Sequence, residues 1–509
     1  MTITIEEESL TRRELVAIAR QYEEVVLSAG VLRRLARQRE AIDAMVASGT
    51  PVYGLSTGFG ALATTFISPD QRRDLQRSLI RSHAAGVGAE VETEVVRAMM
   101  VSRLTNLCSG VSGVRPSTAQ AYADLLNAGI TPVVHEFGSL GCSGDLAPLA
   151  HVALALMGEG EVRDVAGVRR GALEALTAAG LAPVVLAEKE GLALINGTDG
   201  MLGQLILALD DVTGMLQLFD VAAAISIQAL RGTDRVFLEE IHRLRPHPGQ
   251  LVSAANLAAL LVDSPIVSSH LEDVSQVQDA YSLRCAPQVH GAARDTVAYA
   301  SRVADIELGA SIDNPSVLAD GTLASNGNFH GAPVAYALDF VAIVLADVAS
   351  MSERRTDRLL DLDRNFGLSA FLAHDPGVDS GLMIAQYAQA GLVSELKRLA
   401  SPASVDSIPS SGMQEDHVSM GWHAARKLRR SVEAVADVLA IELLAGSRAM
   451  ALRAPLKASP ASQLVVDRVN ALSGGPGPDR WLSPEIRAVG EAVRSGELLE
   501  LVARHVTLG

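Results

Sequence analysis

Three small residues, Cys142-Ser143-Gly144, could form a reactive group from their own backbone. Glycine has no Cβ atom, so backbone segments can approach closely around Gly144 and unusual dihedral angles cost little. Attack of the Gly144 amide nitrogen on the Cys142 carbonyl carbon, with loss of two waters, would leave a 4-methylidene-imidazol-5-one (MIO) ring. Such a ring is an electrophile that no ordinary side chain supplies. The alternative is a Gly/Ser turn leading into a helix, with Asp145 as its cap.

Five blocks of the chain together resemble the motifs of the aromatic amino-acid ammonia-lyases, in that family's order. The blocks are Tyr53-Gly-Leu-Ser-Thr-Gly-Phe-Gly60, Gly138-Ser-Leu-Gly-Cys-Ser-Gly-Asp-Leu-Ala-Pro-Leu-Ala-His151, Gln278-Asp-Ala-Tyr-Ser-Leu-Arg-Cys-Ala-Pro-Gln288, Gly327-Asn-Phe-His330 and Gln414-Glu-Asp-His417. The resemblance runs from about residue 10 to about residue 475, and this context favours the ring over a simple turn. The sequence is most similar to the histidine-specific branch, and to its actinobacterial members in carrying Cys rather than Ala before Ser-Gly.

Tyr53 is the predicted catalytic base, because it lies on a glycine-flanked loop and matches the family's base position. A phenol has a pKa of about 10, so an enclosed, positively biased site must lower it for work near neutrality. Outside its motif, Tyr53 would be interpreted as a packed aromatic residue. The resemblance also implies that Tyr281 joins the catalytic network and that Phe329 stacks near the ring. Asp145 and Asn328 would support ring formation.

Arg284 is the predicted partner of the substrate carboxylate, since a guanidinium stays charged and binds a carboxylate with two parallel hydrogen bonds. Gln278, Tyr281 and Arg284 are three residues apart, so on a helical turn they would point in similar directions. A surface salt bridge is the alternative for Arg284 alone. By resemblance, Gln278 helps to hold the substrate and Asn196 contacts its carboxylate or the ring oxygen.

Two positions concern the side chain of the substrate. By resemblance, family members that act on phenylalanine or tyrosine carry Phe-Leu or His-Leu where this chain has Ser82-His83. They tend to carry Gln where it has Glu415. A carboxylate facing an imidazole N–H makes a charge-assisted hydrogen bond, whereas a phenyl ring would leave the charge unpaired. Outside these motifs, His83 would be a helix-face histidine and Glu415 a solvated carboxylate.

The resemblance therefore implies elimination of ammonia from L-histidine to give trans-urocanate, the first step of histidine degradation. A tyrosine or phenylalanine ammonia-lyase, or an aminomutase, on the same scaffold is the alternative.

Other reaction classes fit the sequence less well. Gly54-Leu-Ser56-Thr-Gly58 matches the nucleophile elbow of serine hydrolases, but the elbow requires a strong strand before it and a helix after it. The following G-x-G-x-x-A pattern lacks the βαβ surroundings of a dinucleotide site. His242, His247 and His270 are too scattered for a metal site. A non-catalytic helical scaffold would have no use for the five blocks. No metal and no external cofactor are predicted.

The composition indicates a helical protein with few candidate macromolecular partners. Of 509 residues, 48% are hydrophobic but only 4% aromatic, which favours helices packed through small side chains. A net charge of −16 argues against nucleic-acid and anionic-membrane partners. Three scattered cysteines provide no disulfide framework, and the first residues lack the basic and apolar regions of a secretory signal. A cytoplasmic location is expected.

Long helices are expected to position these residues. Residues 201–230 and 333–351 are apolar helix patterns, and 414–445 predicts a third long helix with the basic residues of 426–430 on its solvated side. Aspartates interrupt the first two patterns, so neither is a good membrane span. Helices that are apolar nearly all round belong in a bundle core or a subunit interface.

The predicted fold class is therefore mainly α: an elongated central bundle of long helices with a smaller mixed N-terminal part. Residues 1–200 would carry the Tyr53 loop and the ring-forming turn, and 201–509 the long-helix bundle and C-terminal tail. Short β-like segments near 161–168 and 183–187 would be surface decoration. The apolar helices suggest association, and the resemblance implies a homotetramer with active sites shared between subunits.

Overall fold

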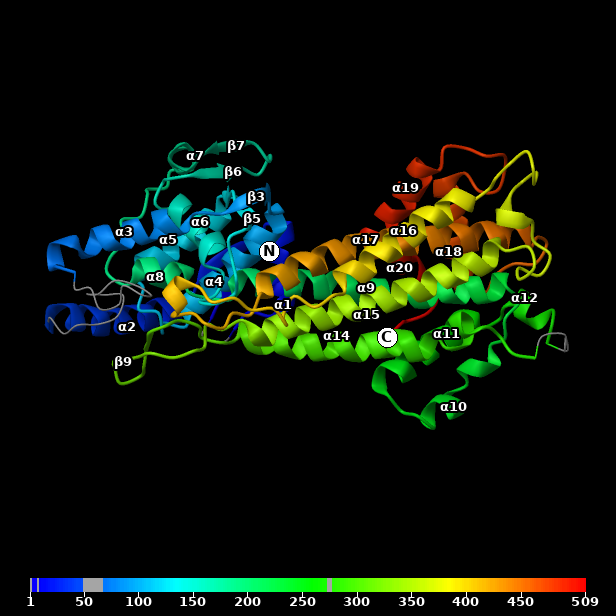
Figure 1. The fold of residues 1–509 in the computed structure, drawn as a ribbon, viewed down its shortest axis with the longest axis horizontal. Coiled ribbons are helices and arrows are strands. Elements are labelled where there is room, and N and C mark those ends of the chain that lie inside the picture. The colour runs from blue at the N-terminus through cyan, green and yellow to red at the C-terminus, as the bar shows by residue number, and fades with distance from the viewer. Residues whose placement is uncertain (1, 7–8, 49–66, 272–276) are drawn as a thin grey trace. The chain divides into compact units, whose positions relative to one another are not determined.

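The computed structural model describes residues 2–6, 9–48, 67–271 and 277–509, which form two compact units (Figure 1). Unit 1 comprises Met1–Leu207, Ala300–Asp339 and Pro402–Arg426, and unit 2 comprises Ala208–Tyr299, Phe340–Ser401 and Lys427–Gly509. Four boundaries fall inside the long helices α9 (Asp199–Ala229), α14 (Ala286–Leu308), α15 (Ala332–Leu360) and α17 (Gly421–Leu452). The division into parts 1–200 and 201–509 stays a prediction.

Unit 1 is built around one buried helix. Its helices are α1 (Arg12–Gln21), α2 (Ala29–Ser48), α3 (Arg72–His83), α4 (Thr93–Cys108), α5 (Pro116–Asn127), α6 (Leu146–Leu156), α7 (Ala172–Ala178) and α8 (Glu190–Ile195). Every side chain of α4 from Val95 to Cys108 is buried, so α4 forms the core of the unit. At α1, Thr11 accepts a hydrogen bond from the Glu14 amide and the Glu14 carboxylate accepts one from the Thr11 amide, a complete capping box.

Short strands complete unit 1. β1 (Thr2–Ile5) pairs in parallel with β2 (Glu24–Leu27); β3 (Val87–Glu90) pairs antiparallel with β5 (His135–Phe137); β4 (Thr131–Pro132), β6 (Glu161–Arg163) and β7 (Arg169–Gly171) form one antiparallel sheet; and β8 (Ser316–Val317) pairs with β9 (Leu323–Ala324). The strand predicted near 161–168 is confirmed for Glu161–Arg163, which form β6, whereas residues 164–168 form the turn that leads to β7. The strand predicted at 183–187 is wrong, because the Val184 amide donates to the Leu156 carbonyl and the Ala187 amide to the Glu190 side chain instead of to a ladder.

The described residues of unit 2 form helices and loops. Besides its parts of α9, α14, α15 and α17, it holds α10 (Glu239–Arg243), α11 (Pro248–Leu261), α12 (Pro265–Ser268), α13 (Tyr281–Arg284), α16 (Met383–Leu399), α18 (Pro460–Ser473), α19 (Leu482–Arg494) and α20 (Glu497–Ala503). The buried carboxylate of Asp220 on α9 pairs with His290 (2.8 Å) and Arg294 (2.7 Å) on α14. The predicted long helices and the mainly α fold class are confirmed.

The third long helix differs from its prediction in two respects. It begins at Gly421 rather than at 414, because Ser419 Oγ donates to the Gly141 carbonyl and the Met420 amide donates to Leu140, so the chain before α17 bonds to another segment. Its basic residues are not all solvated, since Arg426 and Arg429 are buried. In unit 1 Arg426 pairs with Glu92 (2.6 Å), and in unit 2 Arg429 pairs with Asp211 (2.9 Å).

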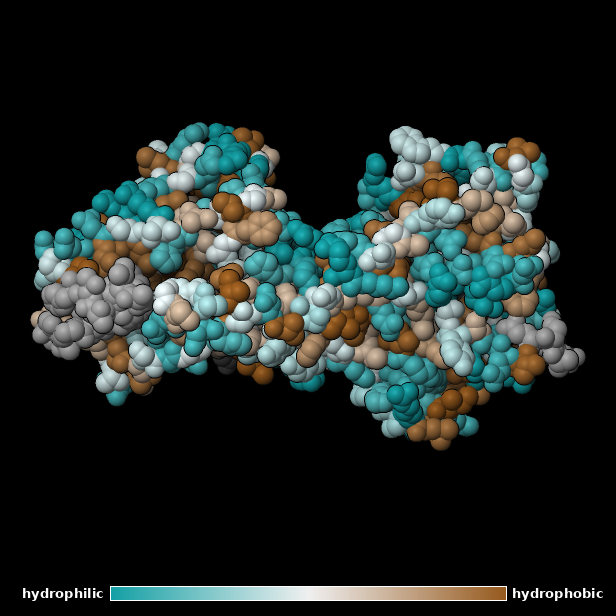
Figure 2. Space-filling model, in the orientation of Figure 1, coloured by the Kyte–Doolittle hydropathy of each residue, from teal (hydrophilic) through white to brown (hydrophobic). Residues whose placement is uncertain are grey.

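Among the described residues, α15 alone has the length and apolar composition that a membrane-crossing helix needs. However, 61% of its apolar window is buried inside the protein, and a buried core helix meets the same criterion. The face drawn in Figure 2 mixes hydrophilic and hydrophobic residues rather than presenting a continuous apolar band. These observations favour a core position for α15.

Candidate active site

The turn before α6 is held by buried hydrogen bonds. Ser139 Oγ accepts from the Gly141 amide at 3.1 Å and donates to Asp145 Oδ1 at 2.8 Å. Asp145 Oδ2 accepts from the Met201 amide at 2.9 Å. Asp145 makes no side-chain cap on α6, so it serves the turn and not the helix. Burial raises the pKa of the Asp145 carboxyl to about 7.

Gly144 lies against another glycine. Its φ is +81°, and a Cβ atom at this position would overlap the backbone carbonyl of Gly197. The Gly197 carbonyl in turn accepts a hydrogen bond of 2.7 Å from the Asp145 amide. Because both the dihedral angle and the space exclude a side chain, only glycine fits this position. Gly144, the predicted ring-forming residue, therefore lies in close backbone contact with Gly197.

Ser143 contacts a carboxylate 272 residues away in the sequence. Its hydroxyl donates to Glu415 Oε1 at 3.1 Å, and Ser410 Oγ donates to Glu415 Oε2 at 2.8 Å. Ser410 and Glu415 also exchange two backbone hydrogen bonds, of 2.9 and 3.3 Å. Glu415 is thus fixed by a small hairpin beside the turn. Cys142 is buried, which raises the pKa of its thiol to about 12.

A cavity of about 610 Å³ opens at this place. Its lining consists of Cys142, Ser143, Asn314, Ser325, Asn326, Phe329, His330, Gln414, Glu415, Asp416 and His417. The volume lies within the range of small-molecule sites, roughly 300–1,000 Å³. The structure therefore brings the ring-forming turn, Phe329 and Glu415 together, as the sequence predicts. Asn328 is exposed, and its amide donates to the side chain of Asn326 at 2.9 Å.

His83, the last residue of α3, belongs to the same neighbourhood. Its Nδ1 lies 2.9 Å from the Leu79 carbonyl, which can only accept, so Nδ1 carries the hydrogen and Nε2 of the neutral ring is an acceptor. Burial lowers the pKa of His83, while the Leu79 carbonyl and the Glu415 carboxylate oppose the shift. The imidazole is therefore neutral near pH 7.

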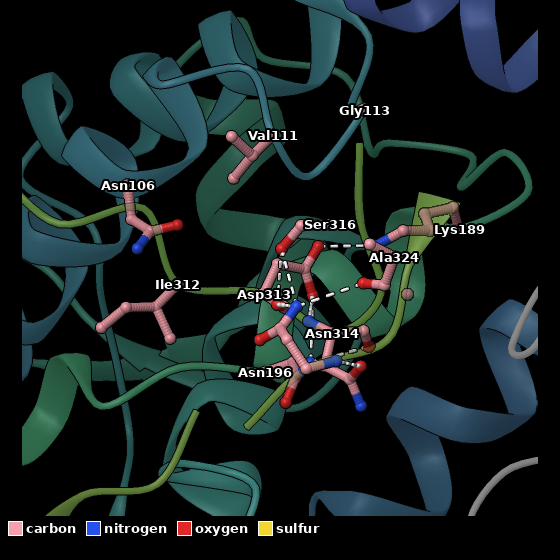
Figure 3. A network of polar contacts seen from close by, with 12 residues as sticks. Asn106, Val111, Gly113, Lys189, Asn196, Ile312, Asp313, Asn314, Ser316 and Ala324 are labelled. Carbon is pink, nitrogen blue, oxygen red and sulfur yellow. Dashed lines mark hydrogen bonds and ion pairs between the residues drawn. The ribbon is translucent and has the colours of Figure 1, made fainter. Parts of the chain in front are cut away.

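Asn196 lies behind the cavity wall. Its Nδ2 donates to Asp313 Oδ1 and to the Asn314 carbonyl, both at 3.0 Å (Figure 3). Asp313 also pairs with Lys189 at 2.6 Å. Sequence reasoning missed Lys189, Asp313 and Ser410, because no local spacing marks residues whose partners lie elsewhere in the chain. The predicted contact of Asn196 with the substrate stays a prediction.

Four predicted site residues remain. Tyr53 falls outside the described residues. Gln278, Tyr281 and Arg284 belong to unit 2, and their approach to the ring-forming turn stays a prediction. Tyr281 is 71% exposed, and its ring stacks under the Arg284 guanidinium at 4.8 Å. The Ser282 carbonyl between them accepts a hydrogen bond from the buried Arg355, which pairs with Glu442.

The helical fold and the turn at Cys142-Ser143-Gly144, which is predicted to form a reactive ring, are the features expected of an amino-acid lyase. The sequence pattern of the family "Aromatic amino acid lyase" matches residues 10–471. The chain belongs to this family, as its five motif blocks predict.

Three known proteins are similar to this chain over nearly its whole length. It is 59% identical to the histidine ammonia-lyase of Streptomyces coelicolor, over 98% of each chain. It matches the structure of histidine ammonia-lyase from Trypanosoma cruzi with a TM-score of 0.92 and 39% identity, over 100% of this chain and 96% of that one. It matches tyrosine aminomutase from Streptomyces globisporus with a TM-score of 0.95 and 36% identity, over 100% of both. The fold thus serves more than one substrate, and the site must distinguish them.

Replacement of Gly144 tests the close contact with Gly197. In Gly144→Ala we expect the turn to open and the chain to keep its full mass, because the new Cβ overlaps the Gly197 carbonyl. The matched control is Gly180→Ala, whose φ is +71° but whose Cβ would meet nothing within 4 Å. The control should lose only about 1–2 kcal/mol of stability, which is the cost of a left-handed conformation for a residue with a side chain. The measurements are the intact mass and the thermal unfolding of both variants. A Gly144→Ala chain that still loses two waters would contradict the expected effect of the new Cβ.

The pH dependence of unfolding tests the environment of Asp145. Its folded pKa of about 7 lies above the unfolded value of about 4. Between these two pH values the folded state therefore binds one more proton than the unfolded state. The contribution of the protonated Asp145 carboxyl to stability is complete below about pH 4 and is lost as the pH rises to about 7. We expect the wild type to lose stability relative to Asp145→Asn over this range in denaturant titrations, because only the wild type titrates. A difference that stays constant would mean that hydrogen bonds keep Asp145 ionised throughout.

Proposed function

We propose that this protein is a histidine ammonia-lyase, which eliminates ammonia from L-histidine and releases trans-urocanate. The observation that carries the proposal is the Glu415 carboxylate, held beside Ser143 in the cavity with a neutral His83 nearby. Relatives named histidine ammonia-lyase, 59% identical in Streptomyces coelicolor, support it. The enzyme would work in the cytoplasm on a small-molecule substrate.

The reactive group would form from Cys142-Ser143-Gly144 without any external cofactor. A bond forms between the Gly144 nitrogen and the Cys142 carbonyl carbon, and the oxygen leaves as water with the amide hydrogens of Ser143 and Gly144. The Cα hydrogen and hydroxyl of Ser143 leave as a second water, so no oxidant is needed. The residues fit this ring, since Gly144 already lies against Gly197 and Cys142 contributes only its backbone carbonyl. When formed, the ring supplies an electrophile that makes the substrate's amino group a better leaving group.

Glu415 would select the imidazole side chain. In the uncyclised chain its Oε1 accepts from Ser143 and its Oε2 from Ser410. Ring formation removes the Ser143 hydroxyl, which frees Oε1 to accept an imidazole N–H in a charge-assisted hydrogen bond. A phenylalanine ring offers no such donor and would leave Oε1 without a hydrogen-bond partner, although Oε2 keeps its bond from Ser410. This difference favours histidine over phenylalanine.

The other roles are completed by residues predicted from the family resemblance. Tyr53 would remove the β-hydrogen, Arg284 and Gln278 would hold the carboxylate and backbone of the substrate, and Tyr281 would join the proton network. Asn196 would support the substrate or the ring oxygen. The 71% exposure of Tyr281 supports assembly into a homotetramer, because a catalytic phenol needs cover that another subunit can supply.

The first test supplies purified protein with L-histidine, L-tyrosine and L-phenylalanine in parallel and follows urocanate by its ultraviolet absorbance. We expect product from histidine alone and an intact mass two waters below that of the encoded chain. Ser143→Ala has no hydroxyl to lose, so it should fold, retain the mass of one or both waters and lose nearly all turnover. A β-amino acid or an acrylate from tyrosine, with none from histidine, would replace this proposal with an aminomutase or tyrosine lyase.

Glu415→Gln tests the basis of selectivity. We expect kcat/KM for histidine to fall at least about tenfold, because a hydrogen bond to a charged group contributes about 1.5–3 kcal/mol. The intact mass should stay two waters low, which separates loss of substrate binding from loss of the ring. Glu395→Gln, on the surface of unit 2, removes the same charge and serves as the control. Unchanged kcat/KM in Glu415→Gln would refute the role assigned to this carboxylate.

A further inference from the structure

A single buried carboxylate connects both ends of α8. Lys189 precedes this helix and donates to Asp313 Oδ2 at 2.6 Å, while Asn196 follows it and donates to Asp313 Oδ1 at 3.0 Å (Figure 3). The Lys189 and Asp313 side chains are completely buried, and Asn196 is 2% exposed. The position of Asn196 is therefore set by Asp313, whose own charge is balanced by Lys189.

This arrangement is costly in two ways. Lys189 adopts φ +73° and ψ −23°, a left-handed conformation that costs a residue with a side chain of order 1–3 kcal/mol. A buried ion pair also pays for removing two charges from water, and an apolar pair of similar size is often equally stable. Stability alone is therefore a poor explanation for Lys189 and Asp313.

The residue after Asn196 leads directly to the ring-forming turn. Gly197 contacts Gly144 so closely that no Cβ fits between them, and its carbonyl accepts from the Asp145 amide at 2.7 Å. A shift of Asn196 would move Gly197 and release Gly144. On its other side, Asp313 Oδ1 accepts from the amide of Asn314, which lines the cavity.

We propose that Lys189 and Asp313 are positioning residues for ring formation: through Asn196 they hold Gly197 against Gly144. They touch neither the substrate nor the reacting atoms, and they act on the backbone of the turn. This proposal rests on the proposed function, since it concerns the same reactive group.

Two double variants without buried charge isolate the role of the acceptor. Lys189→Met with Asp313→Leu removes the charges and the acceptor for Asn196, whereas Lys189→Met with Asp313→Asn removes the charges and keeps an acceptor oxygen. The readout is the fraction of chains lighter by two waters, followed by intact mass after a pulse of synthesis. We expect the Met/Leu pair to cyclise at least about tenfold more slowly than the wild type, given the sensitivity of such reactions to displacement. The Met/Asn pair should be partly rescued.

The control is Asp220→Asn, which disturbs the buried carboxylate that pairs with His290 and Arg294 in unit 2. It should lower the unfolding temperature but leave the rate of cyclisation unchanged. If the Met/Leu pair does not fold, Asn196→Ala replaces it, because that change removes the group that Asp313 holds and keeps the ion pair.

The outcomes separate this proposal from the function on which it rests. If the wild-type chain loses two waters and the Met/Leu variant cyclises equally fast, the positioning role alone is overturned. The same holds if Asn196→Ala, where it replaces the Met/Leu variant, cyclises as fast as the wild type. A wild-type chain of full mass that turns over no histidine overturns the proposed function and the positioning role together. A slow Met/Leu pair, a faster Met/Asn pair and an unaffected Asp220→Asn support both.

Discussion

The contact between Gly144 and Gly197 is the constraint on which the site depends. Neither glycine has a side chain with which to hold the other, and a Cβ on Gly197 would overlap the Arg103 guanidinium. The contact must therefore be maintained by neighbours. The Asp145 amide bonds to the Gly197 carbonyl, and the Asp145 carboxyl bonds to Ser139 and Met201. Each of these groups is buried, so water competes little for the hydrogen bonds of the turn.

Two buried ion pairs lie around this contact. Arg103 pairs with Asp199 at 2.9 Å and also donates to the Asn196 carbonyl at 3.3 Å. Lys189 and Asp313 form a second buried pair, which accepts a hydrogen bond from the Asn196 side chain. Buried ion pairs contribute little net stability, but breaking one is expensive because the remaining charge has no partner. Other arrangements of these groups would leave a buried charge without its partner and so have a higher free energy. The ion pairs therefore specify where Asn196 and Gly197 lie rather than how stable the unit is.

Local features were predictable from the sequence, and long-range ones were not. The capping box at Thr11 and the long apolar helices follow from periodicity and neighbouring residues. The burial of Arg426 and the late start of α17 depend on Glu92 and on the turn at 138–144, which lie hundreds of residues away. Family motifs supplied Ser143 and Glu415 without their contact. Lys189 and Asp313 carry no local signal, because an isolated charged residue usually lies on the surface.

The contact between Ser143 and Glu415 connects the two stages of the proposed activity. One atom, Oε1, accepts from the Ser143 hydroxyl before the ring exists and is assigned to the imidazole afterwards. In the proposed ring formation the hydroxyl leaves as water. The reaction that creates the electrophile would therefore also remove the donor from Oε1, the atom assigned to substrate selection. Ser410 donates to Oε2, which would keep the carboxylate oriented while its other oxygen changes partner. An uncyclised chain would therefore lack both the reactive group and a free acceptor for histidine, and selectivity would arise together with reactivity.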